Sequence, residues 1–154
     1  MLFRSAGDFN FKPSDVVSGS FGKVYRNGRC IAELSEFTGK LSLESKDVLL
    51  SNGETGKKNT AVSFEITVKV QKVFSYELEL LKNIKDGKLN NYCDINVELD
   101  DPEALGAEAI AVANCLPTGD IDILSFTKGE LTEREFTFSA QPSNIDILES
   151  IADI

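Results

Sequence analysis

The chain has 154 residues, which suits one domain with a hydrophobic core of its own. Hydrophobic residues make up 42% of the chain and charged residues 27%, which excludes wholesale disorder. The formal net charge of −9 argues against nucleic-acid binding, because affinity for phosphates comes from lysine and arginine.

Residues 1–15 are predicted to form an N-terminal arm, and residues 16–154 a single β domain. The arm has no regular period, but Phe3, Phe9 and Phe11 make it too apolar for an idle tail, so we expect it to dock on another surface. No segment of the chain is apolar enough for a signal peptide or a membrane span. A soluble protein without a membrane anchor is therefore predicted.

A β-hairpin is the first element with a clear signal. Residues 21–26 and 29–34 flank Asn27-Gly28, the preferred dipeptide of a type I′ turn, in which both central residues need a positive φ. The sequence therefore predicts two antiparallel strands joined by a tight two-residue turn.

Two unusually long strands are predicted next, over residues 37–49 and 61–71. In the second strand apolar and polar residues alternate without a break, which indicates one buried face and one wet face. At about 3.3 Å per residue this strand spans roughly 35 Å. The segment 51–60 between the strands is predicted to be a protruding polar loop, which contains Asn52, Gly53, Glu54, Gly56, Lys57 and Lys58.

One amphipathic helix is predicted from about Ser75 to Asp86. Ser75 suits the N-cap, acidic residues lie in the first turn and lysines in the last, and Gly87 suits the C-terminal stop. The apolar stripe expected to pack on the sheet consists of Phe74, Leu78, Leu81 and Ile84. A single short helix cannot cover a sheet of such long strands, so part of that sheet must face solvent or a partner.

Four more strands are expected over residues 92–99, 107–115, 121–127 and 133–140, and apolar residues at helical spacing indicate a turn of helix within residues 145–154. The three cysteines, Cys30, Cys93 and Cys115, each fall in a predicted strand without CxxC spacing, so we expect small buried side chains in a reducing cytosol. The predicted fold class is mainly β: a β-sandwich or partly open barrel of about seven strands with one packed α-helix.

No motif in the chain supports catalysis or metal binding. Residues 18–25 resemble part of a kinase glycine-rich loop, but Val17 stands where its first glycine belongs. Residues 53–58 have too few positions between the glycines for a phosphate-binding Walker A loop, and the acids of residues 94–101 and 120–122 lack calcium-loop spacing. Histidine is absent, which removes the commonest general base and metal ligand. We therefore predict a protein that is not an enzyme and needs no cofactor or metal.

The order of these elements resembles that of the tail tube proteins of contractile-tailed bacteriophages and phage-like bacteriocins, most nearly the short form in prophages of Gram-positive bacteria. The likeness covers roughly residues 16–150 and rests on element order and loose patterns. The segments that carry it are residues 22–28, 64–73, 97–101 and 135–138.

This resemblance implies a subunit of hexameric rings that stack into a hollow tube, in which the sheets of six copies join edge to edge. The residues expected on the lumen side are Glu44, Glu65, Thr67 and Lys69. The 51–60 loop and the arm would contact the next ring, and the negative charge would keep transported DNA from adhering to the wall.

The implied partners are further copies of the chain, a sheath protein outside, a tape-measure protein inside during assembly, and baseplate and terminator proteins at the ends. No specific nucleic-acid binding is expected. The protein would be made in the bacterial cytoplasm and end in a virion tail or bacteriocin particle, with DNA passage and membrane puncture both open as uses of the tube. The alternative is a stand-alone β-sandwich or barrel that binds a small molecule or carbohydrate; the absence of tryptophan argues against it.

Overall fold

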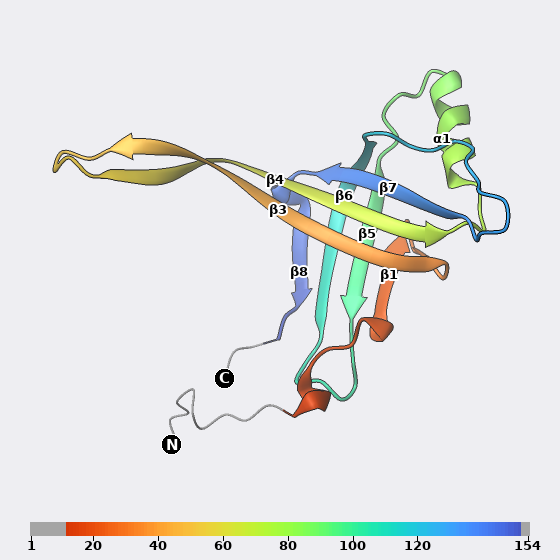
Figure 1. Ribbon diagram of the computed structural model, residues 1–154, viewed down its shortest axis with the longest axis horizontal. Coiled ribbons are helices and arrows are strands. Elements are labelled where there is room, and N and C mark those ends of the chain that lie inside the picture. The colour runs from red at the N-terminus through yellow and green to blue at the C-terminus, as the bar shows by residue number, and fades with distance from the viewer. Residues whose placement is uncertain (1–11, 152–154) are drawn as a thin grey trace.

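The computed structural model describes residues 12–151, so most of the predicted arm lies outside the described residues. The described chain is mainly β and forms one antiparallel sheet that does not close, with a single α-helix (Figure 1). The strands are β1 (Gly22–Arg26), β2 (Arg29–Cys30), β3 (Leu34–Leu49), β4 (Thr55–Gln71), β5 (Cys93–Leu99), β6 (Glu108–Thr118), β7 (Glu133–Ala140) and β8 (Ile145–Glu149). The helix is α1 (Tyr76–Lys85), and the short 3-10 turns are η1 (Pro13–Asp15), η2 (Gly19–Phe21) and η3 (Pro142–Asn144).

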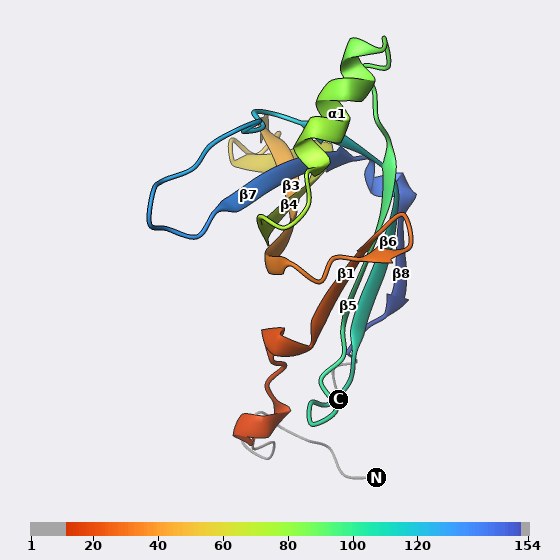
Figure 2. The same cartoon turned by 90° about the vertical axis from the view of Figure 1, so that its right-hand side faces the viewer.

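Strand β6 divides the sheet into two parts, because it pairs with β5 and β8 along one stretch and with β7 near its end. One part contains β2, β1, β5, β6 and β8, and the other continues from β6 through β7 and β4 to β3. The two parts run at a steep angle to each other (Figures 1 and 2). The hydrophobic core lies between them and includes Val24, Ile95 and Val112 from the first part and Ile66 and Phe138 from the second.

The hairpin at Asn27-Gly28 is confirmed. Asn27 has φ 51° and Gly28 has φ 82°, as a type I′ turn requires, and Tyr25 pairs with Cys30. The Asn27 side chain also accepts a hydrogen bond from the Asp94 amide at 2.8 Å, which ties the turn to β5. Strand β2 ends at Cys30, however, so it is shorter than predicted, and the Cys30 side chain is exposed instead of buried.

The expectation of a 51–60 loop is wrong, because residues 55–60 belong to β4 and residues 55–59 pair with the end of β3. The connection is a tight turn in which the Leu50 amide donates to the Glu54 carbonyl and the Gly53 amide donates to the Leu50 carbonyl. Residues 55–60 are polar and thus resemble a loop in sequence, but both faces of the strand lie in solvent, where polar side chains suit a strand. The two strands form a long hairpin that projects far beyond the rest of the molecule (Figure 1).

The helix is present where predicted, but its predicted packing face is wrong. Phe74, Leu78, Leu81 and Ile84 are all exposed, whereas Glu77 and Leu80 are buried. Ser75 occupies the N-cap position without a capping side-chain hydrogen bond, and the helix ends before Gly87, whose φ of 94° suits glycine. Only the first turns of α1 meet the sheet, and the rest of the helix overhangs it (Figures 1 and 2).

Two further expectations are corrected near the C-terminus. Residues 121–127 form no strand but lie in a long connection between β6 and β7. Residues 145–149 are strand β8 and not helix, and they pair with residues 109–112 of β6. The apolar residues of this segment have helical spacing, but the segment forms a strand because the edge of β6 has backbone groups that need hydrogen-bond partners.

Candidate functional site

The four residues predicted to line a lumen lie on one face of the β3–β4 hairpin, opposite the core. Thr67 pairs directly with Thr38, Glu65 with Lys40, Lys69 with Glu36, and Glu44 with Ala61, and directly opposed residues share a face. The alternate residues of β4, Phe64, Ile66 and Val68, are buried in the core. We call the solvent side of β3, β4 and β7 that these residues occupy the polar face.

A row of threonines crosses the polar face from strand to strand. Thr38 of β3 pairs with Thr67 of β4, Thr67 pairs with Thr137 of β7, and Thr137 pairs with Thr118 of β6. The four hydroxyl side chains thus lie at one level across four strands. Sequence reasoning found Thr67 alone, because the row depends on the register of strands far apart in the chain.

Carboxylates outnumber lysines on the polar face. Lys69 lies between Glu36 and Glu135 on the neighbouring strands, with 3.5 Å between its ammonium and the Glu36 carboxylate. At this exposure the ion pair adds little to stability. Along residues 36–44 of β3, 61–71 of β4 and 133–140 of β7, the acids are Glu36, Glu44, Glu65, Glu133 and Glu135, and the lysines are Lys40 and Lys69. The face therefore carries net negative charge.

The projecting half of the β3–β4 hairpin has no buried residue. In β3 every residue after Phe37 is exposed, and in β4 burial begins only at Phe64. The apolar side chains Leu41, Leu43 and Val62 are about half exposed on the side opposite the polar face. Near the tip, Lys46 and Lys58 lie directly opposite each other, an unfavourable like-charge pair in an isolated sheet. The predicted loop residues Asn52 to Lys58 thus form the tip of an extended two-stranded arm.

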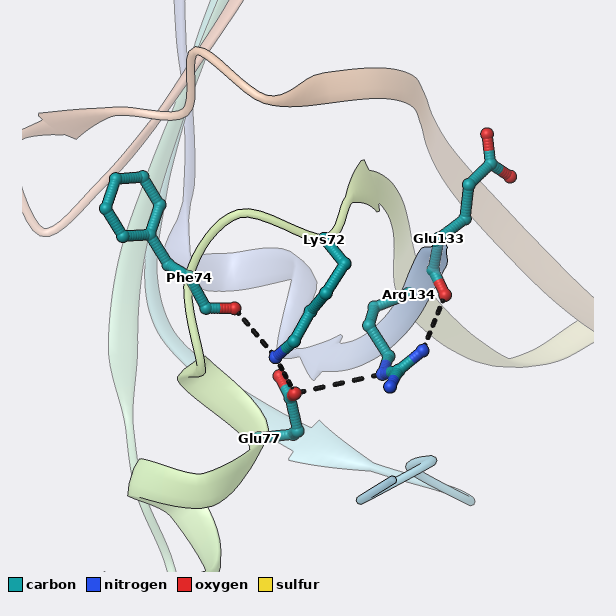
Figure 3. A network of polar contacts seen from close by, with 5 residues as sticks. All are labelled: Lys72, Phe74, Glu77, Glu133 and Arg134. Carbon is teal, nitrogen blue, oxygen red and sulfur yellow. Dashed lines mark hydrogen bonds and ion pairs between the residues drawn. The ribbon is translucent and has the colours of Figure 1, made fainter. Parts of the chain in front are cut away.

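A buried cluster of charged side chains fixes the start of α1 to the sheet (Figure 3). The Glu77 carboxylate is 1% exposed and contacts the Lys72 ammonium directly, and Arg134 Nε lies 3.8 Å from Glu77 Oε1. Lys72 also donates to the Phe74 carbonyl at 2.9 Å, and Arg134 donates to the Glu133 carbonyl at 3.0 Å. A cation of β7, Arg134, and one just after β4, Lys72, thus pair with one acid of the helix, so Glu77 points inward and the apolar stripe points outward.

Aromatic contacts add to this attachment. The Arg26 guanidinium lies 3.6 Å from the centroid of the Tyr76 ring, and Tyr76 meets Phe136 edge to face with 5.2 Å between centroids. Burial raises the pKa of the Tyr76 hydroxyl to about 12. The side chain therefore stays neutral and serves packing.

The two buried thiols are unsuited to chemistry. Burial raises the pKa of Cys93 to about 11 and that of Cys115 to about 12, so neither is a thiolate near neutral pH. Cys93 and Cys115 pair across β5 and β6, and each thiol donates to a backbone carbonyl at 3.6 Å. Their prediction as small buried side chains is confirmed.

The hollows of the described surface differ in their linings, and one of about 490 Å³ is lined mostly by the uncharged polar residues Asn114, Ser139, Gln141 and Asn144. The hollow between β1, β2 and the start of β3 has a volume of about 570 Å³ and a mixed lining that includes Lys23, Phe37 and Glu98. A cavity of about 30 Å³ beside Tyr76 is lined mostly by apolar side chains. Among residues 12–151 no group of three or more histidine, cysteine or acidic side chains could hold a metal ion. No helix in the same range is long and apolar enough to cross a membrane.

An open sheet with a polar face and a projecting hairpin suits a protein that acts through its surfaces. The sequence matches the family described as phage tail tube protein over residues 10–149, so the chain belongs to this family. The predicted resemblance is thereby confirmed, and a structural role, not an enzymatic one, follows from it. The assignment to a Gram-positive type stays a prediction. No curated protein sequence matches the chain.

Solved structures of contractile particles share the fold. The chain is similar to a tube-terminating cap of the anti-feeding prophage, with a TM-score of 0.66 and 15% identity over 96% of this chain and 100% of that chain. It is also similar to a chain of the sheath–tube complex of the extracellular contractile injection system PVC, with a TM-score of 0.62 and 19% identity over 88% and 93%. A chain of the native gene transfer agent virion gives a TM-score of 0.59 and 15% identity over 87% and 100%. At these identities the likeness establishes the fold.

Proposed function

We propose that six copies of this chain form a ring and that the rings stack into a hollow tail tube. The observation that carries the proposal is the open edge of β3, a long strand that has β4 on one side and, within residues 12–151, no strand on the other. A free edge of this length invites further pairing and is a liability in an isolated molecule. Pairing between identical copies satisfies the edge, and a closed ring leaves none free.

The polar face is proposed to line the lumen, with Glu44, Glu65, Thr67 and Lys69 among the lining residues. The threonine row and the excess of carboxylates support this placement, because such a wall is wetted by water and repels a polyanion. Behind Glu65, Thr67 and Lys69 the opposite face cannot take this role, since there it is buried against the other part of the sheet. DNA passage and membrane puncture are both compatible with such a lumen.

The projecting hairpin is proposed to reach the neighbouring ring. Its apolar side chains Leu41, Leu43 and Val62 and its Lys46–Lys58 pair are unfavourable in solvent. Contact with another subunit would cover the apolar side chains and supply acidic partners for the two lysines. The N-terminal arm is proposed to join this contact between rings.

Further partners follow from the family. The similar solved structures belong to a tube-terminating cap and to a sheath–tube complex, and we infer corresponding partners for this chain. These are a sheath protein outside the tube, a tape-measure protein inside it during assembly, and terminator and baseplate proteins at its ends. We infer assembly in the bacterial cytoplasm, after which the chain becomes part of a tail or phage-like particle.

Negative-stain images and sedimentation of the purified chain over a range of concentrations test the proposal. We expect rings with a stain-filled centre and, at high concentration, tubes. A particle that sediments as a monomer at every concentration, including in the presence of its own baseplate proteins as nuclei, would contradict it.

A further inference from the structure

Two apolar surfaces near α1 are left uncovered by the described chain. The first, here called the helix patch, consists of Leu78, Leu81 and Ile84, which are 46%, 39% and 45% exposed. The second, here called the loop patch, consists of Leu124, Phe126 and Leu131, which are 80%, 72% and 90% exposed. The first three follow one another at helical spacing and the second three share one loop, and exposed apolar patches are typical of interaction surfaces.

The loop patch lies on the connection between β6 and β7, residues 119–132, which has no regular secondary structure. Loops of this length in compact domains are usually functional or disordered. This one is held at both ends, because Ile121 packs against the core and the Thr132 carbonyl accepts a hydrogen bond from the Lys72 amide at 2.8 Å. Its middle projects to the side of the molecule (Figure 2).

The charges around the two patches are complementary. The loop carries Asp120, Asp122 and Glu130 with a single lysine, Lys128. The second half of the helix and the residues just after it carry Lys82, Lys85 and Lys88 with one acid, Asp86. In a chain with net charge −9, the end of the helix is thus a locally basic surface, and the loop is acidic. Such complementarity favours one contact over others between like-charged copies.

The patches do not cover each other within one molecule. The helix overhangs the sheet in one direction and the loop projects in another, and their apolar side chains remain exposed (Figures 1 and 2). Two different surfaces of one chain that fit each other produce a head-to-tail contact, which generates a ring when the rotation closes.

We propose that the loop patch of one copy packs on the helix patch of the next copy in the same ring. The inference rests on the proposed function, since it assumes that the chain assembles with itself. It adds the surfaces that meet and explains why α1 turns its apolar stripe away from its own sheet.

Cross-linking of engineered cysteines tests this contact in the full chain. In a Cys30→Ser background, Phe126→Cys and Leu81→Cys are combined, and assembled protein is oxidised with copper phenanthroline. We expect a ladder of covalent oligomers on a denaturing gel, because each copy contributes one cysteine to each of two contacts. A mixture of chains that carry only Phe126→Cys or only Leu81→Cys should stop at dimers. The matched control joins Leu81→Cys to Lys23→Cys, an exposed position on β1 outside both patches, and should give no ladder.

A second variant measures the contribution of the patch. Phe126→Ser with Leu131→Ser should weaken assembly about tenfold or more, because buried aromatic anchors dominate interfaces. Thermal unfolding of the unassembled chain should stay unchanged, since both side chains are exposed in it.

The possible failures can be told apart. Rings or tubes of the parent chain without the Phe126–Leu81 ladder would overturn this inference and leave the proposed function standing. A ladder that stops at dimers in the doubly substituted chain would also overturn it, because such a contact would be symmetric. A parent chain that never assembles would overturn the proposed function and this inference with it.

Discussion

The carboxylate of Glu77 shows how one residue can reverse the packing of a helix. A helical stripe of four apolar residues predicts the buried face of α1, yet the structure buries Glu77 beside Lys72 and Arg134. A buried charge is costly unless it is paired, and both partners lie outside the helix, Lys72 just before it and Arg134 on β7. The correct face could not be predicted because Arg134 lies on β7, far along the chain.

We expect Glu77→Gln to lower the free energy of unfolding by about 3 kcal/mol, because it leaves two cations near the core without their counterion. Urea denaturation followed by circular dichroism measures the loss. Glu79→Gln is the matched control, since Glu79 is exposed in the same turn and should change stability by less than about 0.5 kcal/mol. Equal losses in both variants would contradict this role of Glu77.

The cysteines should differ sharply in reactivity. Cys30 is exposed, whereas Cys93 and Cys115 are buried and protonated near neutral pH. A thiol reagent at pH 8 should therefore modify one cysteine in the native chain and all three in urea. Mass spectrometry counts the modified sites, and rapid labelling of Cys93 or Cys115 in the native protein would show that the core is not closed as described.

The same thiols predict a loss of stability in alkali. Their pKa is raised on folding from 9 to about 11 and about 12, so the folded chain keeps protons that the unfolded chain loses. This contribution is fully present below pH 9, falls as the pH rises above 9, and is lost by pH 11 to 12. Urea midpoints measured from pH 8 to 11 should decline less steeply in a Cys93→Ala, Cys115→Ala variant than in the parent. Identical slopes would contradict the assignment.

At the scale of elements, the β3–β4 hairpin shows what the sequence pattern can and cannot predict. Strict alternation in residues 61–71 predicts a strand with one buried face, and β4 has that face. The predicted start of this strand at residue 61 was wrong, because β4 already begins at Thr55. Residues 55–60 are polar and include two lysines, and such a segment resembles a loop when neither face of the strand is buried. The opposite error occurred at residues 121–127, where apolar side chains resemble a strand but form none, and two of the four, Leu124 and Phe126, are exposed. Both errors fall where the isolated chain leaves a surface uncovered.

The projecting hairpin should be dispensable for folding and required for assembly. Replacing residues 43–62 by Asn-Gly closes the hairpin on the Ser42–Ser63 pair and removes no buried side chain. We expect an unchanged urea midpoint and no tubes in negative-stain images. Asn59→Ser keeps the hairpin length and should assemble normally. Tubes of normal length and yield from the shortened chain would refute a role between rings.

At the scale of the whole molecule, composition predicted the fold class but not the arrangement. Alternating strands, one helix and a net charge of −9 led to a mainly β structural protein, which the family confirms. The threonine row across β3, β4, β7 and β6 could not be predicted, because it requires the register of four strands whose order in the sheet differs from their order in the chain. Surfaces that meet between copies could not be predicted either, because the hydrophobic pattern of a sequence reports burial within one chain.

The acidic character of the molecule predicts that it does not bind nucleic acid. With net charge −9 and carboxylates in excess on the polar face, the chain should not retard duplex DNA in a gel at about 0.15 M salt. Lys40→Glu with Lys69→Glu should behave identically. Micromolar affinity for DNA in the parent would contradict the proposed character of the lumen wall.

We propose that identical copies complete this open sheet as a tube with the polar face inward. A cryo-electron microscopy reconstruction of the assembled chain tests it most directly. We expect six copies per ring, an edge of β3 paired with the neighbouring copy, and Glu65, Thr67 and Lys69 directed into an open channel. A reconstruction that places these residues on the outside, or that leaves the β3 edge unpaired, would contradict it.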